Sequence, residues 1–257
     1  MDRFFLNNEQ IFDGNVTFPE DLTKQIRKVL RLDAKDAVVV LDNSGWEYLV
    51  QLDDVKAKNA VGHVMDKQLG RPEPSVKLSL AYSLARRDKI EMIIQKATEI
   101  GIAKFYPYVS SRSLVQDLNT NRARQERLEA IAREACEQSM RSKLPELMTV
   151  TSFEGMLKET SEHDLKLIAW EGTAIVQHVC AEMIDPLMKK ENPSVVILIG
   201  PEGGFSTEEV ALAEKYGYEQ ISFGNNIFRM ETACIAGSAI MRHLVDTSQL
   251  NCKRQNR

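Results

Sequence analysis

Two patterns of hydrophobic and polar positions divide the chain. Residues 37–69 hold short runs rich in β-branched and aromatic residues, separated by turn residues such as Asp42-Asn43-Ser44-Gly45. This pattern is typical of a small antiparallel barrel or sandwich. The stretch LGRPEPS, residues 69–75, places two prolines beside a glycine and predicts a linker. We therefore expect a small β domain over residues 1–70.

Beyond the linker, strand-like and helix-like segments alternate, which predicts an α/β domain over residues 73–248 with a parallel sheet covered by helices. One helix is marked by apolar residues at spacings of three and four and ends at Gly101; they are Ile90, Ile93, Ile94, Ala97 and Ile100. The expected strands cover 76–83, 103–109, 165–170, 195–199 and 219–223. The other helices are expected over about 121–141, in a stretch up to about 190, between Ser206 and Gly217, and up to about 246. Residues 249–257 are expected to form a frayed tail.

The stretch IGPEGGFSTEE, residues 199–209, joins a strand to a helix through a glycine loop. The run before it, 195–199, is uninterrupted and β-branched, as expected of a strand covered on both faces. Ser206 and Glu209 have the spacing of a capping box at a helix start. Because open parallel sheets bind ligands at the carboxyl ends of their strands, this loop is a candidate ligand site.

A phosphate is not the ligand that this loop predicts. The chain contains neither G-x-x-x-x-G-K-[ST] nor G-x-G-x-x-G, the signatures of nucleoside triphosphate and dinucleotide binding. Glu202 lies inside the loop, and its charge would repel a phosphate, so a cationic or zwitterionic ligand fits better. Gly203 and Gly204 allow a ligand to approach the backbone closely, and Pro201 stiffens the turn.

A second unusual loop, residues 223–233, follows the next predicted strand. It places Ile227, Phe228 and Met230 beside Arg229 and Glu231, just before a helix rich in small residues. Apolar loop residues either pack beneath the loop or line a pocket for a flat group. Two neighbouring strand ends that both carry unusual loops favour a pocket.

These two loops resemble the C-terminal motifs of a known family. IGPEGGFSTEE and FGNNIFRMETA are similar to motifs of the small-subunit ribosomal RNA (uracil-N3)-methyltransferases, the E-type enzymes of the SPOUT superfamily. MDRFF, RKVLRL, DKIEMIIQKATEIGI with PYVSSRS, and EACEQSMRSKLPEL resemble the other blocks of that family, in the same order. The resemblance covers nearly the whole chain, and the ordered set is more specific than any single motif.

The resemblance implies a PUA-like RNA-binding barrel at the N-terminus and an α/β methyltransferase domain whose C-terminal part is tied in a trefoil knot. It also implies that the loops bind S-adenosylmethionine, largely through backbone groups; the cationic sulfonium and amino group tolerate Glu202. Carried over by motif position, the cofactor-binding residues are Trp170, Glu171, Ile199, Gly200, Pro201, Glu202, Gly203, Gly204, Phe223, Gly224, Asn226, Ile227, Phe228, Arg229 and Thr232. The chain has Asn226 where the family usually has arginine, and Phe228 where it has leucine. Arg229 is therefore the cation that we expect to act.

The activity that the resemblance implies is methylation of N3 of a specific uridine in the 16S ribosomal RNA of the small subunit. The imide proton must leave and the nitrogen must align with the methyl group, so positioning and electrostatics supply most of the rate. The expected catalytic residues are Arg229, which stabilises charge on the uracil carbonyls, and Glu231 or Glu202 as the base. In the alternative, Glu231 and Thr232 cap the last helix, or Arg229 pairs with a structural carboxylate. A non-catalytic RNA-binding or ribosome-assembly protein with the same fold is the alternative function.

RNA contacts are expected from basic residues. Lys24, Arg27, Lys28 and Arg31 fall on one helix face, opposite Leu22, Ile26, Val29 and Leu30. Such a face is either simply solvated or, as the resemblance implies, binds phosphate with help from Arg3, Arg112, Arg133 and Arg141. The formal net charge is −4, but residues 71–145 hold 14 Lys and Arg against 9 Asp and Glu. This segment is either a polyanion footprint or an ordinary solvated face.

Composition restricts the remaining classes. No apolar run approaches the roughly 18 residues that span a bilayer, and MDRFFLNNEQ does not resemble a signal peptide, so we expect a soluble, cytoplasmic protein without membrane contact. The 4 cysteines never form a C-x-x-C pair, and the 4 histidines lack ligand spacing, so neither disulfides nor a metal are expected. The resemblance implies a homodimer, with Ile235, Ile240 and Met241 serving either that contact or the core.

Overall fold

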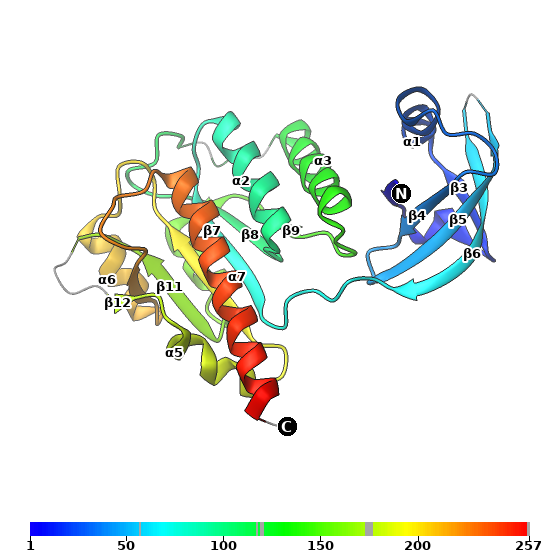
Figure 1. Ribbon diagram of the computed structural model, residues 1–257. Helices are drawn as coiled ribbons and strands as arrows, with labels where there is room; N and C mark the ends of the chain where they lie inside the picture. The colour runs from blue at the N-terminus through cyan, green and yellow to red at the C-terminus, as the bar shows by residue number, and fades with distance from the viewer. Residues whose placement is uncertain (57, 117, 119–120, 173–176, 256–257) are drawn as a thin grey trace. The chain divides into compact units, whose positions relative to one another are not determined.

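The structure is a computed structural model of the whole chain. It describes residues 1–56, 58–116, 118, 121–172 and 177–255. Two compact units divide the chain: residues 1–73 with 133–144 form the first, and residues 74–132 with 145–257 form the second. Each unit has its own sheet (Figure 1). Each also has its own hydrophobic core.

The first unit is built on a six-stranded sheet in the order β1-β4-β5-β6-β3-β2. β1 runs parallel to β4, and the other neighbours are antiparallel. The strands are β1 (Arg3–Phe5), β2 (Ile11–Phe12), β3 (Asn15–Phe18), β4 (Ala37–Leu41), β5 (Trp46–Val55) and β6 (Ala60–Leu69), and a 3-10 turn, η1 (Asn8–Gln10), precedes β2. The predicted runs form β4, β5 and β6. The first three strands were not predicted, because two to four residues are too few to show a period.

The predicted basic helix of the first unit is shorter and less regular than expected. An α-helix, α1 (Glu20–Lys24), continues as a π-helix, η2 (Gln25–Leu30), and Arg31 follows with a left-handed φ of 58°. Ile26 is fully buried as predicted, but Val29 is 71% exposed, so the predicted apolar face is wrong at Val29. The reason is the wider π-helical turn, which shifts the later residues from the α-helical period.

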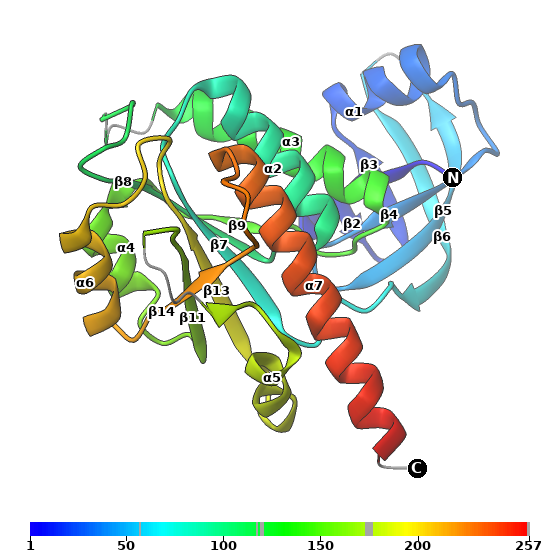
Figure 2. The same cartoon turned by 60° about the vertical axis from the view of Figure 1, so that its left-hand side comes forward.

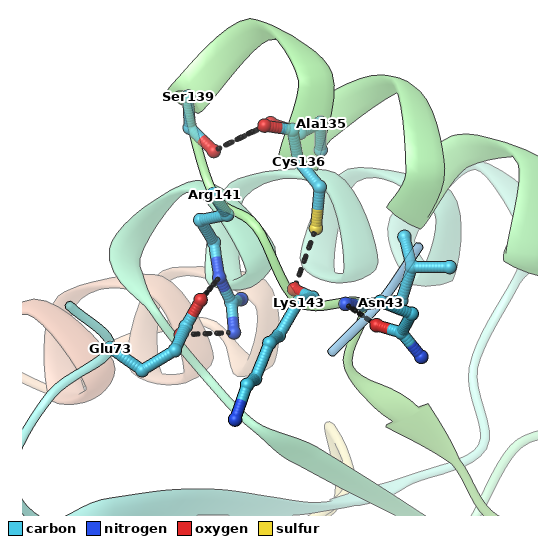
Figure 3. Close-up of polar contacts among 8 residues, drawn as sticks. Asn43, Glu73, Ala135, Cys136, Ser139, Arg141 and Lys143 are labelled. Carbon is cyan, nitrogen blue, oxygen red and sulfur yellow. Dashed lines mark hydrogen bonds and ion pairs between the residues drawn. The ribbon is translucent and has the colours of Figure 1, made fainter. Parts of the chain in front are cut away.

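The first unit also contains residues 133–144, which are the C-terminal part of helix α3 (Arg122–Ser139) and the loop after it. Cys136 is fully buried in an apolar cluster of this unit, and the Leu144 amide donates to Asn43 Oδ1 over 2.7 Å. Figure 3 shows this loop beside Asn43. The sequence pattern assigned the whole helix to the second domain, because helical periodicity does not reveal which surface an apolar face covers.

The second unit contains an eight-stranded sheet in the order β10-β8-β7-β13-β11-β14-β12, with β9 paired to β8. All neighbouring strands that the structure describes in this sheet are parallel, which confirms the predicted α/β class. The strands are β7 (Lys77–Ser83), β8 (Lys104–Val109), β9 (Glu146–Leu147), β10 (Thr151–Ser152), β11 (Leu165–Ala169), β12 (Gln177–His178), β13 (Ser194–Ile199) and β14 (Glu219–Ser222).

Helices cover both faces of this sheet (Figure 2). Side chains of β13 alternate between two core clusters: Val195, Ile197 and Ile199 join one, whereas Val196 and Leu198 join the other. The first cluster includes α2 (Arg87–Ile100), α5 (Ala181–Ile184), the 3-10 segment η3 (Asp185–Lys189) and α7 (Met230–Gln255); the second includes α4 (Phe153–Glu159) and α6 (Thr207–Lys215). β13 is therefore a strand buried on both faces, as its uninterrupted apolar run predicted.

The C-terminal segment differs from the prediction. Helix α7 continues to Gln255, so the expected end near 246 and the expected frayed tail from 249 are wrong. Ser248 is only 1% exposed, three residues after the fully buried Val245, so the helix still covers the core there. Helix α4 was not predicted, and the helical stretch expected up to about 190 consists of α5 and η3.

Candidate functional site

Three neighbouring strands of the second unit, β13, β11 and β14, end at a pocket of about 400 Å³. Its walls come from the glycine loop (residues 200–205), the second loop (residues 223–229), residues 169–171 after β11, and Lys89 at the start of α2. The pocket thus lies at the carboxyl ends of adjacent parallel strands, where open α/β sheets bind ligands.

Most of the predicted cofactor-binding residues line this pocket. They are Trp170, Glu171, Ile199, Gly200, Pro201, Glu202, Gly204, Phe223, Gly224, Asn226, Ile227, Phe228 and Arg229. Gly203 and Thr232 are not among the lining residues: a Cβ at Gly203 would lie 3.2 Å from Arg112 Cβ, and Thr232 is exposed on α7. The two loop motifs therefore predicted the position of the pocket.

The glycine loop is held by a turn in its own backbone, by the start of helix α6 and by Arg112. Gly204 has a φ of 67°, which favours glycine, and its amide donates to the Pro201 carbonyl over 2.9 Å. The capping box is confirmed: the Glu209 amide donates to Ser206 Oγ, and the Ser206 amide donates to Glu209 Oε2. Arg112 Nη1 donates to the carbonyls of Gly203 and Phe205, over 3.3 Å each.

The second loop contributes aromatic walls. The Phe223 and Phe228 rings stack with their centroids 6.4 Å apart and their planes at 11°. Phe223 also packs on Gly237 of α7, where an added Cβ would lie only 2.6 Å from the ring. Met230 is buried, whereas Ile227 is 78% exposed at the pocket rim. The sequence left open whether apolar loop residues pack beneath the loop or line a pocket. Phe223 and Phe228 do both, because their rings pack together and also line the pocket.

Lys89 is the charged residue among the pocket-lining residues that sequence reasoning missed; the others are Ala169, Phe205, Ile221, Ser222, Met230 and Ala233. The Lys89 Nζ lies 3.1 Å from Glu202 Oε1 and 3.0 Å from Glu231 Oε2. The contact with Glu231, reinforced by Glu202, raises the pKa of the Lys89 ammonium. The motif DKIE, residues 88–91, carried a signal for it only through the family resemblance, because nothing local marks the two partners.

Arg229 and Glu231 have different electrostatic surroundings. Arg229 is exposed and makes no ion pair with any residue that the structure describes. Burial opposes ionisation of Glu231, but its own backbone amide, Lys89 and Arg229 outweigh burial and lower the pKa of this carboxyl. Glu231 is therefore an ionised carboxylate at neutral pH, and the guanidinium of Arg229 is available to a ligand.

The predicted RNA-binding residues fall into two groups. Lys24, Arg27, Lys28, Arg31, Arg112 and Arg133 are exposed. The side chains of Arg3 and Arg141 are only 4% and 9% exposed. Arg3 pairs with Glu47 over 2.5 Å. Arg141 pairs with Glu73 over 2.8 Å (Figure 3). The expectation that Arg3 and Arg141 bind phosphate is corrected here, because both guanidinium groups lie inside the first unit against carboxylates.

Other expectations concern the subunit contact, metals and membranes. Met241 is fully buried in the core of the second unit, while Ile235 and Ile240 are half-buried. Within the described ranges, no cluster of three or more His, Cys, Asp or Glu side chains is arranged to hold a metal ion. In the same part of the chain, no helix has both the length and the apolar character needed to cross a membrane.

A parallel sheet with a pocket built by its strand-end loops defines the second unit as an α/β ligand-binding domain, and the sequence pattern of the RNA methyltransferase domain family matches residues 71–242. The chain belongs to the family of ribosomal RNA small subunit methyltransferase E, as its relatives show. The enzyme of that name from Bacillus subtilis is 30% identical over 237 residues, which are 91% of this chain and 93% of the relative. That of Mesomycoplasma hyopneumoniae is 31% identical over 239 residues, 91% of this chain and 96% of the relative.

Solved structures support the fold. The crystal structure of a ribosomal RNA small subunit methyltransferase E from Neisseria gonorrhoeae, bound to S-adenosyl methionine, matches with a TM-score of 0.82. The match covers 95% of this chain and 98% of that chain, at 24% sequence identity. The likeness at this identity concerns the fold, which the two proteins share over nearly their whole length.

Proposed function

We propose that this protein uses S-adenosylmethionine to methylate N3 of a specific uridine in the 16S ribosomal RNA of the small subunit. The observation that carries the proposal is the pocket of about 400 Å³, whose two main walls are the loops that match the family motifs. The names of the relatives, and the S-adenosyl methionine in the Neisseria gonorrhoeae structure, support the same conclusion.

The residues of the pocket fit this cofactor. Gly200 and Gly204 expose backbone for close approach: a Cβ at Gly200 would lie 2.9 Å from the Phe205 ring, and Gly204 has a left-handed φ. Phe228 offers an apolar wall, and Glu171 and Glu202 offer carboxylates to a cationic ligand. When bound, the sulfonium supplies an activated methyl group, and the task left to the chain is to align the acceptor.

Arg229 is the residue proposed to act on the acceptor base. Its free guanidinium at the pocket would stabilise the negative charge that develops on the uracil carbonyls as N3 loses its proton. The imide proton is proposed to pass to Glu202, whose carboxylate lines the pocket, rather than to Glu231, whose pKa is lowered. The Glu231 carboxylate instead balances Lys89.

The RNA contact is proposed to use exposed cations: Lys24, Arg27, Lys28 and Arg31 in the first unit, with Arg133, and Arg112 in the second. We further propose that the six-stranded sheet is the PUA-like barrel, that the segment from β11 to α7 is tied in a trefoil knot, and that the protein acts as a homodimer in the cytoplasm. Light scattering tests the dimer: a mass near twice the 29.1 kDa of the chain is expected.

Labelled S-adenosylmethionine tests the reaction. The protein is incubated with small ribosomal subunits, and with free 16S RNA, both prepared from cells that lack the modification, and the RNA is then digested to nucleosides. Labelled N3-methyluridine is the expected product. A different labelled nucleoside would contradict the uridine N3 target but retain the methyltransferase class. Cofactor binding without any transfer would favour the alternative, a non-catalytic RNA-binding or ribosome-assembly protein.

A further inference from the structure

Lys89 joins three segments of the second unit that are far apart in the sequence. It lies in the first turn of α2, while Glu202 lies in the glycine loop and Glu231 in the first turn of α7. The two N–O distances are 3.1 Å and 3.0 Å, and the three side chains are only 17%, 24% and 16% exposed. This partial burial limits solvent screening, so these contacts should be stronger than ion pairs on the open surface.

The carboxylate of Glu231 depends on Lys89. Its Oε2 atom is shielded from solvent and accepts no well-aligned hydrogen bond from the described residues, although the Lys89 ammonium is close by. A shielded carboxylate that loses its counter-ion must find another cation or a proton. The other cation whose charge acts on Glu231 is Arg229, two residues away in the sequence.

Arg229 has no ion pair with any residue that the structure describes, whereas Glu231 is paired with Lys89. The guanidinium has no ion pair among the described residues, although an ionised carboxylate lies two positions along the chain. We propose that Lys89 is a positioning residue: by binding Glu202 and Glu231 it fixes the glycine loop to the first turn of α7 and keeps Arg229 from being captured by Glu231. The inference rests on the proposed function, because it supposes that a free Arg229 contacts the acceptor base.

Kinetics of four variants test this role. Lys89→Met should lower kcat about 10- to 100-fold, a larger change than the one in the Kd of S-adenosylmethionine measured by calorimetry. Lys89→Arg keeps a cation that reaches both carboxylates, so its kcat should stay within about 3-fold of the wild type. The matched control is Lys96→Met, which removes another lysine of α2, paired with Glu99 over 2.8 Å, and should behave as the wild type.

The decisive variant is the double change Lys89→Met with Glu231→Gln. A neutral amide does not hold a guanidinium as a carboxylate does, so the double variant should recover most of the kcat that Lys89→Met alone loses. A double variant no faster than Lys89→Met would overturn the capture of Arg229, and a wild-type kcat in Lys89→Met would overturn the whole inference. Circular dichroism and thermal unfolding establish that each variant is folded.

Hydrogen exchange separates this inference from the proposed function. In Lys89→Met, but not in Lys96→Met, amides of residues 200–206 and 229–233 should exchange faster, because the glycine loop and the start of α7 lose their shared cation. Unchanged exchange would contradict the claim that Lys89 holds these two segments, whatever the enzyme methylates. If wild-type protein transfers no methyl group to any RNA while the exchange result holds, the proposed function fails and the structural role of Lys89 stands.

Discussion

Arginines in the two units show how differently one residue type is used. In the second unit, Arg229 is exposed beside the pocket and has no ion pair among the described residues. In the first unit, Arg3 binds Glu47 through two hydrogen bonds, of 3.2 Å and 2.5 Å, and Arg141 binds Glu73. The sequence suggested a functional contact for all three arginines. Only Arg229, which lies in a loop at a strand end, lines the pocket, because partners distant in sequence occupy the guanidinium groups of Arg3 and Arg141.

The largest effect is expected where an arginine is buried. Arg3→Met should lower the free energy of unfolding by about 3–5 kcal/mol, because it leaves the Glu47 carboxylate buried without a partner. Urea unfolding followed by circular dichroism measures the change. The matched control is Arg122→Met, whose pair with Glu126 is 92% and 59% exposed and should contribute less than about 1 kcal/mol. Equal losses in both variants would show that burial does not distinguish the two pairs.

The opposite result is expected for the exposed arginine. Arg229→Ala should lower kcat by about 100-fold or more, because it removes the group proposed to stabilise charge on the base. Its unfolding free energy should stay within about 0.5 kcal/mol of the wild type. Single-turnover methyl transfer and urea unfolding of the same preparation give both numbers. Wild-type turnover would remove Arg229 from the mechanism.

A smaller effect is expected from the exposed cations of the first unit. Replacing Lys24, Arg27, Lys28 and Arg31 with glutamine should lower RNA affinity about 10-fold at low salt and flatten its salt dependence, because fewer phosphates are neutralised. Filter binding over a series of KCl concentrations measures the slope. Arg141→Gln should leave that slope unchanged, since its guanidinium is occupied by Glu73. An unchanged slope in the fourfold variant would place the RNA contact elsewhere.

The smallest effect is expected for Glu137 in helix α3, whose carboxyl should make the free energy of unfolding depend on pH. Burial raises the pKa of Glu137 to about 7, although the Phe5 amide donates to its Oε1 over 3.3 Å. Because the folded pKa lies above the unfolded one, the stability that Glu137 contributes is present below about pH 4.5 and lost as the pH rises through about 7. Glu137→Gln should therefore stabilise the protein by about 1–2 kcal/mol at pH 8.5 and change little at pH 4.5. The same difference at both pH values would exclude a titration of Glu137.

Short-range features were predictable because their causes lie within a few residues. The helix of 87–100 ends at Gly101, whose φ of 110° permits the left-handed cap that the sequence indicated. The Ser206 capping box and strand β13, which is buried on both faces, could also be predicted, because each depends on residues within one short segment. The two loop motifs marked most of the pocket lining for the same reason, since each motif is one continuous segment at a strand end.

The sequence by itself therefore determined the class of fold, the longer strands of both sheets, and the position of the pocket. Only the tertiary structure decided which charges meet: Lys89 reaches Glu202 across 113 positions, Arg3 reaches Glu47 across 44, and Arg141 reaches Glu73 across 68. It also decided that residues 133–144 belong to the first unit. The physical reason is that periodicity and capping act over one or two turns, whereas ion pairing and burial depend on which distant segments packing brings together.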